Sequence, residues 1–210
     1  MKLNWQTMII AVWLAAAISC PAGETNSAAI HRETGSASGR PANWAQPMER
    51  PGLKNFYQVT TNLFRGAQPT AEGMKQLKAM GIKTVINLRA SHSDKDQVAS
   101  TGLQSMRFGT EPWHANAEDV ARFLKIVTAP NNLPAFVHCE RGADRTGLMC
   151  AMYRIAVCGW TKPQAVAEMK NGGFGFNPAW HNLIAFIEKA DVDKFKRTAG
   201  IGSDARMADK

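Results

Sequence analysis

The chain has 210 residues, of which 45% are hydrophobic and 20% are charged, and its formal net charge is +8. This length predicts one core domain of about 140 residues with appendages. The positive charge favours anionic partners such as phosphorylated proteins, lipid headgroups and cell-envelope polymers. Because Lys and Arg are scattered, without a dense basic run or interleaved aromatic residues, the composition argues against nucleic-acid binding.

The first 20 residues are typical of an export signal. Met1 and Lys2 give a basic start, and residues 8–19 form an uncharged run too short for an ordinary membrane span. Residues 17–20 read Ala-Ile-Ser-Cys and resemble a lipobox, so Cys20 is a candidate lipid anchor. Cleavage by an ordinary signal peptidase near Ala22, or retention as an N-terminal anchor, are the alternatives. We therefore expect an exported periplasmic or cell-envelope protein.

Residues 21–51 lack helical or strand periodicity and predict a flexible spacer. The next residues predict strands over 55–59, 63–65, 82–88, 103–108 and 135–138, and helices over 71–80, 93–100, 117–128, 145–157, 162–170 and 178–189. This alternation predicts an α/β domain over residues 52–195, with a central, twisted, mostly parallel sheet flanked by helices. The site is expected at the carboxyl end of a strand. Residues 196–210 predict a polar tail.

The strongest functional signal is the segment 136–147, which reads Phe-Val-His-Cys-Glu-Arg-Gly-Ala-Asp-Arg-Thr-Gly. A strand that ends at His138 and a helix that begins near Arg145 leave a loop around the helix N-terminus. Unpaired backbone N–H groups and the helix dipole attract an anion there. Gly142 provides the backbone freedom that such a loop needs, and Gly147 is expected to let the helix pack closely on the sheet. The predicted phosphate-binding residues are Glu140, Arg141, Gly142, Ala143, Asp144 and Arg145.

These six residues are called the cradle below. Cys139 lies at the base of the predicted cradle and is the candidate nucleophile. The positive potential of the loop and a nearby Arg are expected to lower the pKa of its thiol below the free value of about 8.5, which gives a thiolate at neutral pH. Arg145 can hold two phosphoryl oxygens in a bidentate manner. Thr146 can donate its hydroxyl to the sulfur when a phosphocysteine is hydrolysed, and His138 is expected to orient the loop. This chemistry requires no metal and no other cofactor.

The segment resembles the signature His-Cys-x5-Arg-Ser/Thr of the cysteine-dependent protein tyrosine and dual-specificity phosphatases. Three further segments resemble small dual-specificity phosphatases, namely residues 62–69, residues 81–89 and residues 152–175. The likeness extends to the exported bacterial tyrosine phosphatases that regulate biofilm formation. It implies a small dual-specificity-phosphatase-like fold and hydrolysis of phosphotyrosine in proteins, with phosphoserine and phosphothreonine as alternatives.

The general acid is where the sequence departs from the pattern of this family. The family places an Asp some twenty to thirty residues before the Cys, on a loop from which it protonates the departing oxygen. The corresponding segment here offers Glu111, His114, Glu118 and Asp119. Glu111 is the first candidate, and Asp119 is an alternative that also fits the start of a helix. Asp144 is a further alternative, either as an acid or as a partner that fixes the loop.

Two other functions stay open on the sequence. The first is hydrolysis of inositol phosphates or phosphoinositides. Lipid-directed relatives often have Lys where this chain has Ala143, which weakens that interpretation. The second is a pseudophosphatase that binds phosphate esters without turnover, motivated by the absence of an obvious acid. The intact Cys139, Arg145 and Thr146 argue against it. We expect a phosphorylated protein as the substrate and membrane anchoring through the N-terminus as an option.

Overall fold

The computed structural model of the protein describes residues 39–111 and 114–202. The expected export signal, Cys20 and most of the expected spacer lie outside these residues. None of the helices in the described ranges is both long and apolar enough to cross a membrane.

In the described part of the chain, six strands form one mixed sheet in the order β1-β2-β3-β6-β4-β5. The strands are β1 (Gln46–Pro47), β2 (Tyr57–Thr60), β3 (Leu63–Gly66), β4 (Thr84–Asn87), β5 (Gln104–Arg107) and β6 (Ala135–His138). The neighbours β3, β6, β4 and β5 run parallel, whereas β1 and β2 extend one edge in antiparallel pairs. The predicted mostly parallel sheet is therefore confirmed.

Strand β6 lies between β3 and β4, and all four of its residues are buried. Its last residue, His138, is in register with Gly66 of β3 and with Asn87 of β4. The carboxyl ends of three parallel strands therefore meet just before Cys139. In open α/β sheets this is the edge at which ligands bind.

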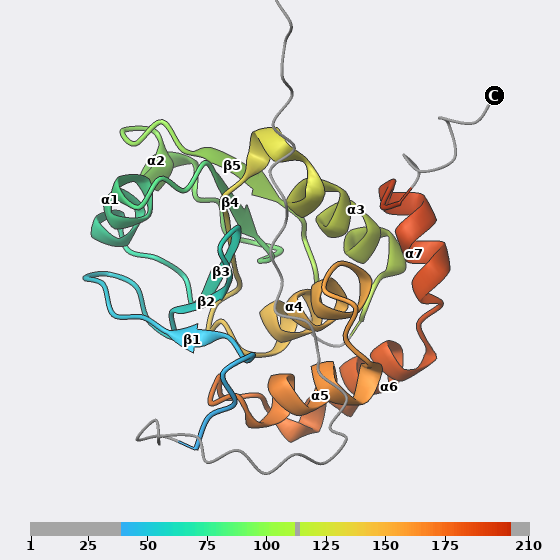
Figure 1. The fold of residues 1–210 in the computed structure, drawn as a ribbon. Coiled ribbons are helices and arrows are strands. Elements are labelled where there is room, and N and C mark those ends of the chain that lie inside the picture. The colour runs from blue at the N-terminus through green and yellow to red at the C-terminus, as the bar shows by residue number, and fades with distance from the viewer. Residues whose placement is uncertain (1–38, 112–113, 203–210) are drawn as a thin grey trace, which may run out of the picture.

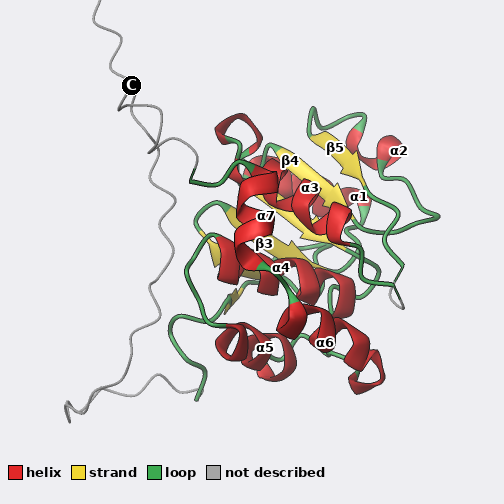
Figure 2. Ribbon diagram, turned by 90° about the vertical axis from the view of Figure 1, so that its right-hand side faces the viewer, coloured by secondary structure: helices red, strands yellow, loops and turns green. Residues whose placement is uncertain are grey.

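The helices cover both faces of the sheet (Figure 1). They are α1 (Ala71–Ala79), α2 (Lys95–Val98), α3 (Ala117–Thr128), α4 (Asp144–Ala156), α5 (Lys162–Asn171), α6 (His181–Lys189) and α7 (Val192–Ala199), with the 3-10 turns η1 (Pro130–Asn132) and η2 (Pro178–Trp180). Phe136 of β6 packs in the core cluster that contains α1 and α2, whereas its neighbours Ala135 and Val137 pack with α3 to α7. Figure 2 shows α3, α4 and α7 in front of the strands. This is the alternation of side chains expected for a strand buried on both faces.

Helix α3 shows why the periodic segments are predicted well. Asn116 accepts a hydrogen bond from the backbone N–H of Glu118, which caps the first turn. Its apolar residues Val120, Phe123, Leu124 and Val127 are all buried, as their helical spacing predicts. Helix α3 and strand β6 have the predicted bounds, and α4 begins and ends one residue earlier than predicted.

The prediction of a flexible spacer through residue 51 is wrong for residues 39–51. Strand β1 pairs with β2, and the Arg40 guanidinium lies 5.1 Å from the ring centroid of Tyr57. Ala45 is buried, and its N–H donates to Oε1 of Glu168. Glu168 also accepts two hydrogen bonds, of 2.9 and 2.8 Å, from Arg154. The segment is ordered through contacts with distant residues, including the hydrogen bond from Ala45 to this buried ion pair, which local periodicity does not report.

Helix α7 is not among the predicted elements, and it continues to Ala199, beyond the expected start of the polar tail at residue 196. Its sequence is mostly charged or polar, but Phe195 and Ala199 are buried within the core cluster that includes α3. Asp191 caps its first turn, and Gly200, with φ of 73°, ends it in the left-handed conformation. Only a narrow apolar stripe faces the core, which explains why the sequence pattern does not indicate a helix.

Candidate active site

The loop between β6 and α4 forms a narrow pocket around Cys139. A cavity of about 200 Å³ is lined by Cys139, Glu140, Arg141, Asp144, Arg145 and Trp180. Cys139 is only 3% exposed and lies at the base, while Arg141 is exposed at the mouth. Four of the six predicted phosphate-binding residues, Glu140, Arg141, Asp144 and Arg145, therefore line the pocket of the candidate nucleophile at the N-terminus of α4, whereas Gly142 and Ala143 do not line it.

Gly142 adopts the conformation that the loop requires. Its φ is +72°, in the left-handed region. A Cβ at this position would lie 2.4 Å from the carbonyl carbon and oxygen of Gly66, at the end of β3. Gly147 is also tightly packed, but against Met169 of α5, whose Cγ would lie 3.1 Å from an added Cβ. The expectation that Gly147 serves packing on the sheet is thus corrected to packing on a helix.

Arg65 of β3 supports the loop from below. It is 1% exposed, and its Nη2 donates to the carbonyl oxygen of Gly142 at 2.8 Å. Its guanidinium also lies 3.6 Å from the centroid of the Phe174 ring. A carbonyl held by Arg65 cannot turn into the pocket, where it would repel a phosphate. The sequence analysis does not predict this role, and its one signal is a charged residue within an otherwise buried strand.

Arg145 lines the pocket and contacts the segment that carries the acid candidates. Its Nη1 donates to the carbonyl oxygens of Thr110, at 3.1 Å, and Leu88, at 3.4 Å. The guanidinium is partly exposed, so its remaining N–H groups can reach a phosphoryl group. Thr146 is fully buried, and its hydroxyl has no hydrogen-bond partner among the described residues. Its donation to the sulfur of Cys139 stays a prediction.

His138 is buried next to the nucleophile and is tied to a residue that the sequence does not single out. Its Nε2 lies 2.9 Å from Oδ2 of Asp94, and its Nδ1 lies 3.2 Å from the carbonyl oxygen of Cys139. Gln68 donates to the other oxygen of Asp94 at 2.8 Å. Asp94 follows β4 by seven residues in a loop, where neither spacing nor periodicity indicates it.

Two buried groups near the loop have shifted pKa values. Burial by itself would raise the pKa of Asp94, but the hydrogen bond and charge of His138, together with hydrogen bonds from Gln68 and Asn87, lower it below its ordinary value. Burial raises the pKa of the Cys150 thiol to about 11. Cys139 and Cys150 are the free cysteines among the described residues, whereas Cys158 is disulfide-bonded. Cys150 is therefore a neutral, buried thiol at physiological pH.

The candidates for the general acid differ in their surroundings. Asp144 accepts hydrogen bonds at both carboxylate oxygens, from Arg141 at 2.8 Å and from the backbone N–H of Asn177 at 2.8 Å. This favours its role as a partner that fixes the loop. Asp119 is 3.5 Å from the hydroxyl of Thr110, beside the segment that Arg145 contacts. Glu111 is partly buried next to Thr110, whose carbonyl oxygen accepts from Arg145, and it stays the first candidate. Neither Glu111 nor Asp119 lines the pocket of Cys139.

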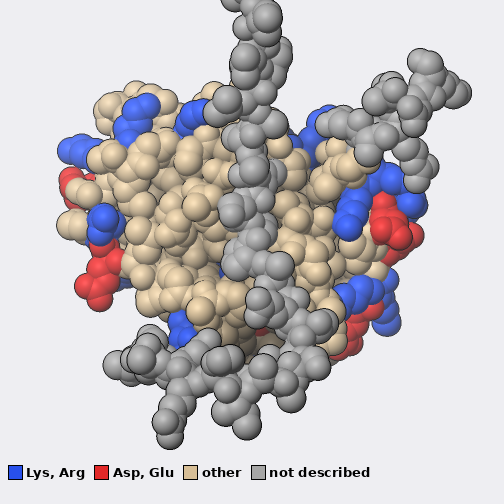
Figure 3. All heavy atoms as spheres, in the orientation of Figure 1, with Lys and Arg blue, Asp and Glu red and all other residues tan. Residues whose placement is uncertain are grey.

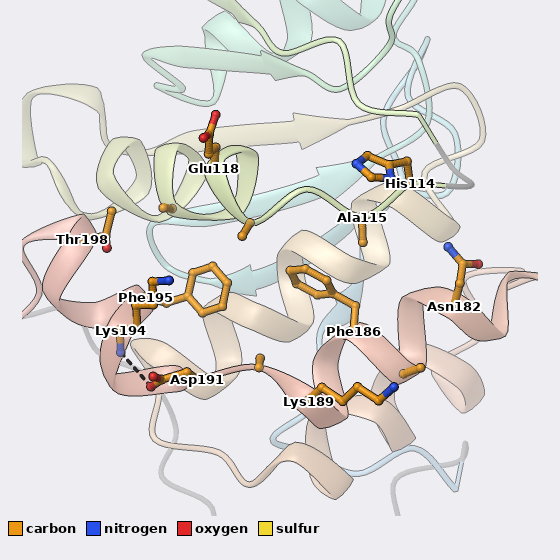
Figure 4. Close-up of a pocket in the computed structure, with 14 residues that line it drawn as sticks. His114, Ala115, Glu118, Asn182, Phe186, Lys189, Asp191, Lys194, Phe195 and Thr198 are labelled. Atoms are coloured by element: carbon orange, nitrogen blue, oxygen red, sulfur yellow. Dashed lines mark hydrogen bonds between the residues drawn. The ribbon is translucent and has the colours of Figure 1, made fainter.

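His114 and Glu118 line a different and larger cavity of about 810 Å³ (Figure 4). This groove lies between α3, α6 and α7, and Phe186 and Phe195 project into it. None of the cradle residues lines it. This groove is thus separate from the nucleophile, and His114 and Glu118 do not line the pocket of Cys139.

The described residues contain no metal-binding cluster, and the face drawn in Figure 3 shows no single concentrated basic patch. No group of three or more His, Cys, Asp and Glu residues in the described ranges is arranged to hold a metal ion. On the face drawn in Figure 3, Lys and Arg lie in separate groups around the edge, interspersed with Asp and Glu.

The model of one protein family matches residues 42–178, and its description is "DSP-PTPase phosphatase fused to NAD+ Kinase". The chain belongs to the DSP-PTPase phosphatases. It is therefore a cysteine-dependent phosphatase, and its α/β fold is the dual-specificity-phosphatase-like fold that was predicted. The match begins at residue 42, consistent with the packing of β1 on the domain.

The relatives of this DSP-PTPase include a dual specificity protein phosphatase and inositol diphosphatases. The dual specificity protein phosphatase TpbA of Pseudomonas aeruginosa is 35% identical over 85% of this chain and 82% of its own length. A crystal structure of a cysteine-to-serine variant of TpbA in complex with phosphotyrosine has a TM-score of 0.69 and 30% identity, covering 78% of this chain and 99% of that chain. The inositol diphosphatase SIW14 of Saccharomyces cerevisiae is 27% identical over 70% of this chain and 54% of its own length.

Proposed function

We propose that this phosphatase hydrolyses phosphotyrosine in proteins, with Cys139 as nucleophile and Glu111 as general acid. The observation that carries the proposal is the burial of Cys139 at the base of a narrow pocket with Trp180 in its wall. A phosphoryl group on a long, flat phenol can reach such a base, whereas a short phosphoserine reaches it less readily. The relative crystallised with phosphotyrosine supports the same substrate.

In the first step, the thiolate of Cys139 attacks phosphorus and forms the S–P bond while the P–O bond to the tyrosyl oxygen breaks. Glu111, as a carboxylic acid, gives its proton to the departing phenoxide. The loop N–H groups and Arg145 bind the phosphoryl oxygens throughout. For this, Arg145 can keep the contacts of its Nη1 with Thr110 and Leu88 and bind the phosphoryl group through its other N–H groups.

In the second step, water attacks the phosphocysteine. Glu111, now a carboxylate, takes one proton from that water, the P–O bond forms and the S–P bond breaks. Thr146 donates its hydroxyl to the departing sulfur of Cys139, which leaves as a thiolate. The products are inorganic phosphate and the starting enzyme, with the acid protonated again, so atoms and protons balance.

The test compares variants on a phosphotyrosine peptide and on p-nitrophenyl phosphate. Cys139→Ser should abolish turnover of both, and EDTA should leave the wild type unchanged. Glu111→Gln should lower peptide turnover by about 100-fold and remove the fall in rate at alkaline pH. The effect on p-nitrophenyl phosphate should be smaller, because its leaving group needs less protonation.

Glu118→Gln is the matched control, because it makes the same chemical change on a side chain that lines the other cavity. It should retain wild-type turnover. If Asp119→Asn or Asp144→Asn reproduces the expected Glu111→Gln behaviour and Glu111→Gln does not, the acid assignment is wrong. A wild type that binds the peptide without releasing phosphate would refute the catalytic proposal itself.

An inositol diphosphate substrate is the second candidate, and the relatives named inositol diphosphatases favour it. The loop of this chain has Ala143 buried where a basic side chain would be needed to bind a more highly charged ligand. Parallel assays with an inositol pyrophosphate and the phosphotyrosine peptide decide between them. A kcat/KM more than about tenfold higher for the inositol compound would assign that substrate.

We further propose that the enzyme is exported to the periplasm or cell envelope. The basic start and the apolar run of residues 8–19 support this, and Cys20 is the candidate lipid anchor. Mass spectrometry of the protein from the membrane and periplasmic fractions distinguishes a lipidated Cys20 from cleavage near Ala22. Recovery of the unprocessed chain in the cytoplasm would refute export.

A further inference from the structure

Asn55, between β1 and β2, has an unusual backbone conformation beside the catalytic loop. Its φ is +51°, and no other non-glycine residue in the described ranges has a positive φ. Asn enters the left-handed region more readily than most residues, but such a conformation persists only where the surrounding structure maintains it. The contacts of the Asn55 side chain show what maintains it here.

The side-chain amide of Asn55 joins two segments that are distant in the sequence. Its Nδ2 donates to the carbonyl oxygen of Arg141 at 2.8 Å and to the carbonyl oxygen of Phe174 at 2.9 Å. A side-chain amide has two N–H donors, so both are used. Arg141 belongs to the cradle, and Phe174 belongs to the segment between α5 and α6. Asn55 therefore bridges the phosphate-binding loop and this segment.

The bond to Arg141 completes a set of contacts that direct the carbonyl groups of the cradle outward. Three consecutive carbonyl oxygens accept from donors outside the loop, namely Glu140 from the Gln68 N–H at 3.1 Å, Arg141 from Asn55, and Gly142 from Arg65 at 2.8 Å. The C=O and the following N–H of a trans peptide point in opposite directions, so the N–H groups of residues 141–143 are directed to the inner side of the loop. No described residue accepts a hydrogen bond from them. Consecutive N–H groups of this kind form a nest for an anion.

The bond to Phe174 connects the cradle to the wall of the pocket. Between α5 and η2 the chain has no regular structure, and Gly173 and Gly175, on either side of Phe174, have φ of +73° and +77°. Phe174 itself is buried, and its ring packs edge-on against a neighbouring aromatic ring. It is thus a firmly held point in the segment that leads to Trp180, which lines the pocket of the nucleophile. Asn55 fastens the cradle to this point.

We propose that Asn55 is a positioning residue that holds the carbonyl group of Arg141 out of the cradle and fixes the cradle against the wall that contains Trp180. Without this bond the peptide between Arg141 and Gly142 can turn, which places a carbonyl oxygen where the cradle requires an N–H donor. The partial negative charge of that oxygen then faces the phosphoryl oxygens and weakens their binding. The proposal rests on the cradle binding the phosphoryl group in the proposed function, and it extends that function to a residue that sets the affinity of the loop for anions.

The test measures anion binding without turnover. Inorganic phosphate is titrated into the full-length protein at constant pH and ionic strength, and its dissociation constant is determined by phosphorus NMR. Asn55→Gly removes the amide and still permits the positive φ. We expect its dissociation constant to be about tenfold higher than that of the wild type, because one hydrogen bond and the preorganisation of the loop are lost. The KM for p-nitrophenyl phosphate should rise with it.

Asn62→Gly is the matched control, because it removes the same side chain from the turn between β2 and β3, where the backbone of Asn62 makes the hydrogen bonds. Its dissociation constant for phosphate should stay within about twofold of the wild type. Asn55→Ala removes the same amide as Asn55→Gly but disfavours a positive φ. It should therefore unfold at a lower urea concentration than Asn55→Gly and bind phosphate equally weakly.

A purely structural role gives a different result. If Asn55 only stabilises the fold, phosphate binding should follow the urea midpoint, with Asn55→Ala weaker than Asn55→Gly, and loss of folded enzyme should lower kcat without changing KM. Either pattern, or a dissociation constant for Asn55→Gly within about twofold of the wild type, would overturn the proposal. A wild type that binds phosphate but does not hydrolyse the peptide would refute the proposed function and leave the role of Asn55 in anion binding standing.

Discussion

Gly142 provides the most direct test of the phosphate-binding loop, through the substitution Gly142→Ala. Its φ of +72° is unfavourable for a residue with a Cβ, at a cost of about 1–2 kcal/mol. The added Cβ would lie 2.4 Å from the Gly66 carbonyl group and 2.6 Å from the Ala67 nitrogen. Ordinary contacts between such atoms are about 3.5 Å or longer, so the loop must move by roughly 1 Å.

The energy of this displacement can be estimated from the same geometry. Overpacking against rigid backbone costs about 1–3 kcal/mol in addition to the backbone strain, which gives a total of about 2–5 kcal/mol. Misplacement of catalytic groups by about 1 Å reduces turnover by roughly 100-fold. We therefore expect Gly142→Ala to lose both stability and activity, measured by urea unfolding and by p-nitrophenyl phosphate hydrolysis.

Gly159→Ala measures the cost of the backbone strain at positive φ without the steric contact of an added Cβ. Gly159 has a φ of +74°, but a Cβ there would meet nothing within 4 Å. It should lose only about 1–2 kcal/mol of unfolding free energy and retain wild-type activity. If Gly142→Ala is as stable as Gly159→Ala and its turnover is within about tenfold of wild type, the close approach of the loop to β3 does not constrain the site as argued.

Two further predictions concern buried groups. Glu168→Gln removes the negative charge that pairs with the buried Arg154 guanidinium. The free energy of unfolding should therefore fall by about 3–5 kcal/mol in urea titrations. The exposed Glu188→Gln should change it by less than about 0.5 kcal/mol, and equal effects of the two would contradict this account. The second prediction follows from the raised pKa of Cys150. The thiol ionises above its ordinary pKa of 9.0 in the unfolded chain, whereas in the folded protein it stays neutral up to about pH 11. The contribution of Cys150 to the free energy of unfolding is therefore fully present below pH 9.0 and is lost as the pH rises to about 11. The loss is about 3 kcal/mol, and Cys150→Ala should flatten this part of the stability profile; a wild-type profile with the same slope as the variant would count against it.

The sequence predicts well those helices and strands whose bounds are determined by their own residues. Helix α3 has a capping Asn116 and a regular apolar stripe, and β6 is a short buried apolar run, so the bounds of both agree with expectation. Residues 39–51 and α7 are different. Their order depends on contacts with distant partners, such as Glu168 for Ala45, and these are invisible to a local pattern.

The same distinction holds within the site. The nucleophile, the cradle and Arg145 are contiguous, and the chemistry of an anion-binding loop limits which residues fit each position. The residues that hold the loop in place come from elsewhere in the chain. Arg65 belongs to β3 and Asp94 to the loop after β4, and no spacing relates either of them to the signature. Asp94 even resembles an ordinary helix cap in sequence, and only the structure shows that its side chain contacts His138.

The arrangement of these supports explains how the loop can be ready for an anion before one arrives. Arg65 holds a loop carbonyl from beneath, Asp94 fixes His138 on one side, and Asp144 joins Arg141 to the backbone of Asn177 on the other. Each contact is made between groups of the protein itself, so the loop loses little freedom on binding phosphate. Preorganised donors of this kind stabilise charge in a transition state without reorganisation at the moment of reaction. Arg145 differs from these supports, because its Nη1 donates to the carbonyl oxygens of Thr110 and Leu88 while its other N–H groups can bind the phosphoryl group. Since one of these carbonyls belongs to Thr110, next to Glu111, Arg145 links the phosphate-binding loop to the segment that carries the proposed acid.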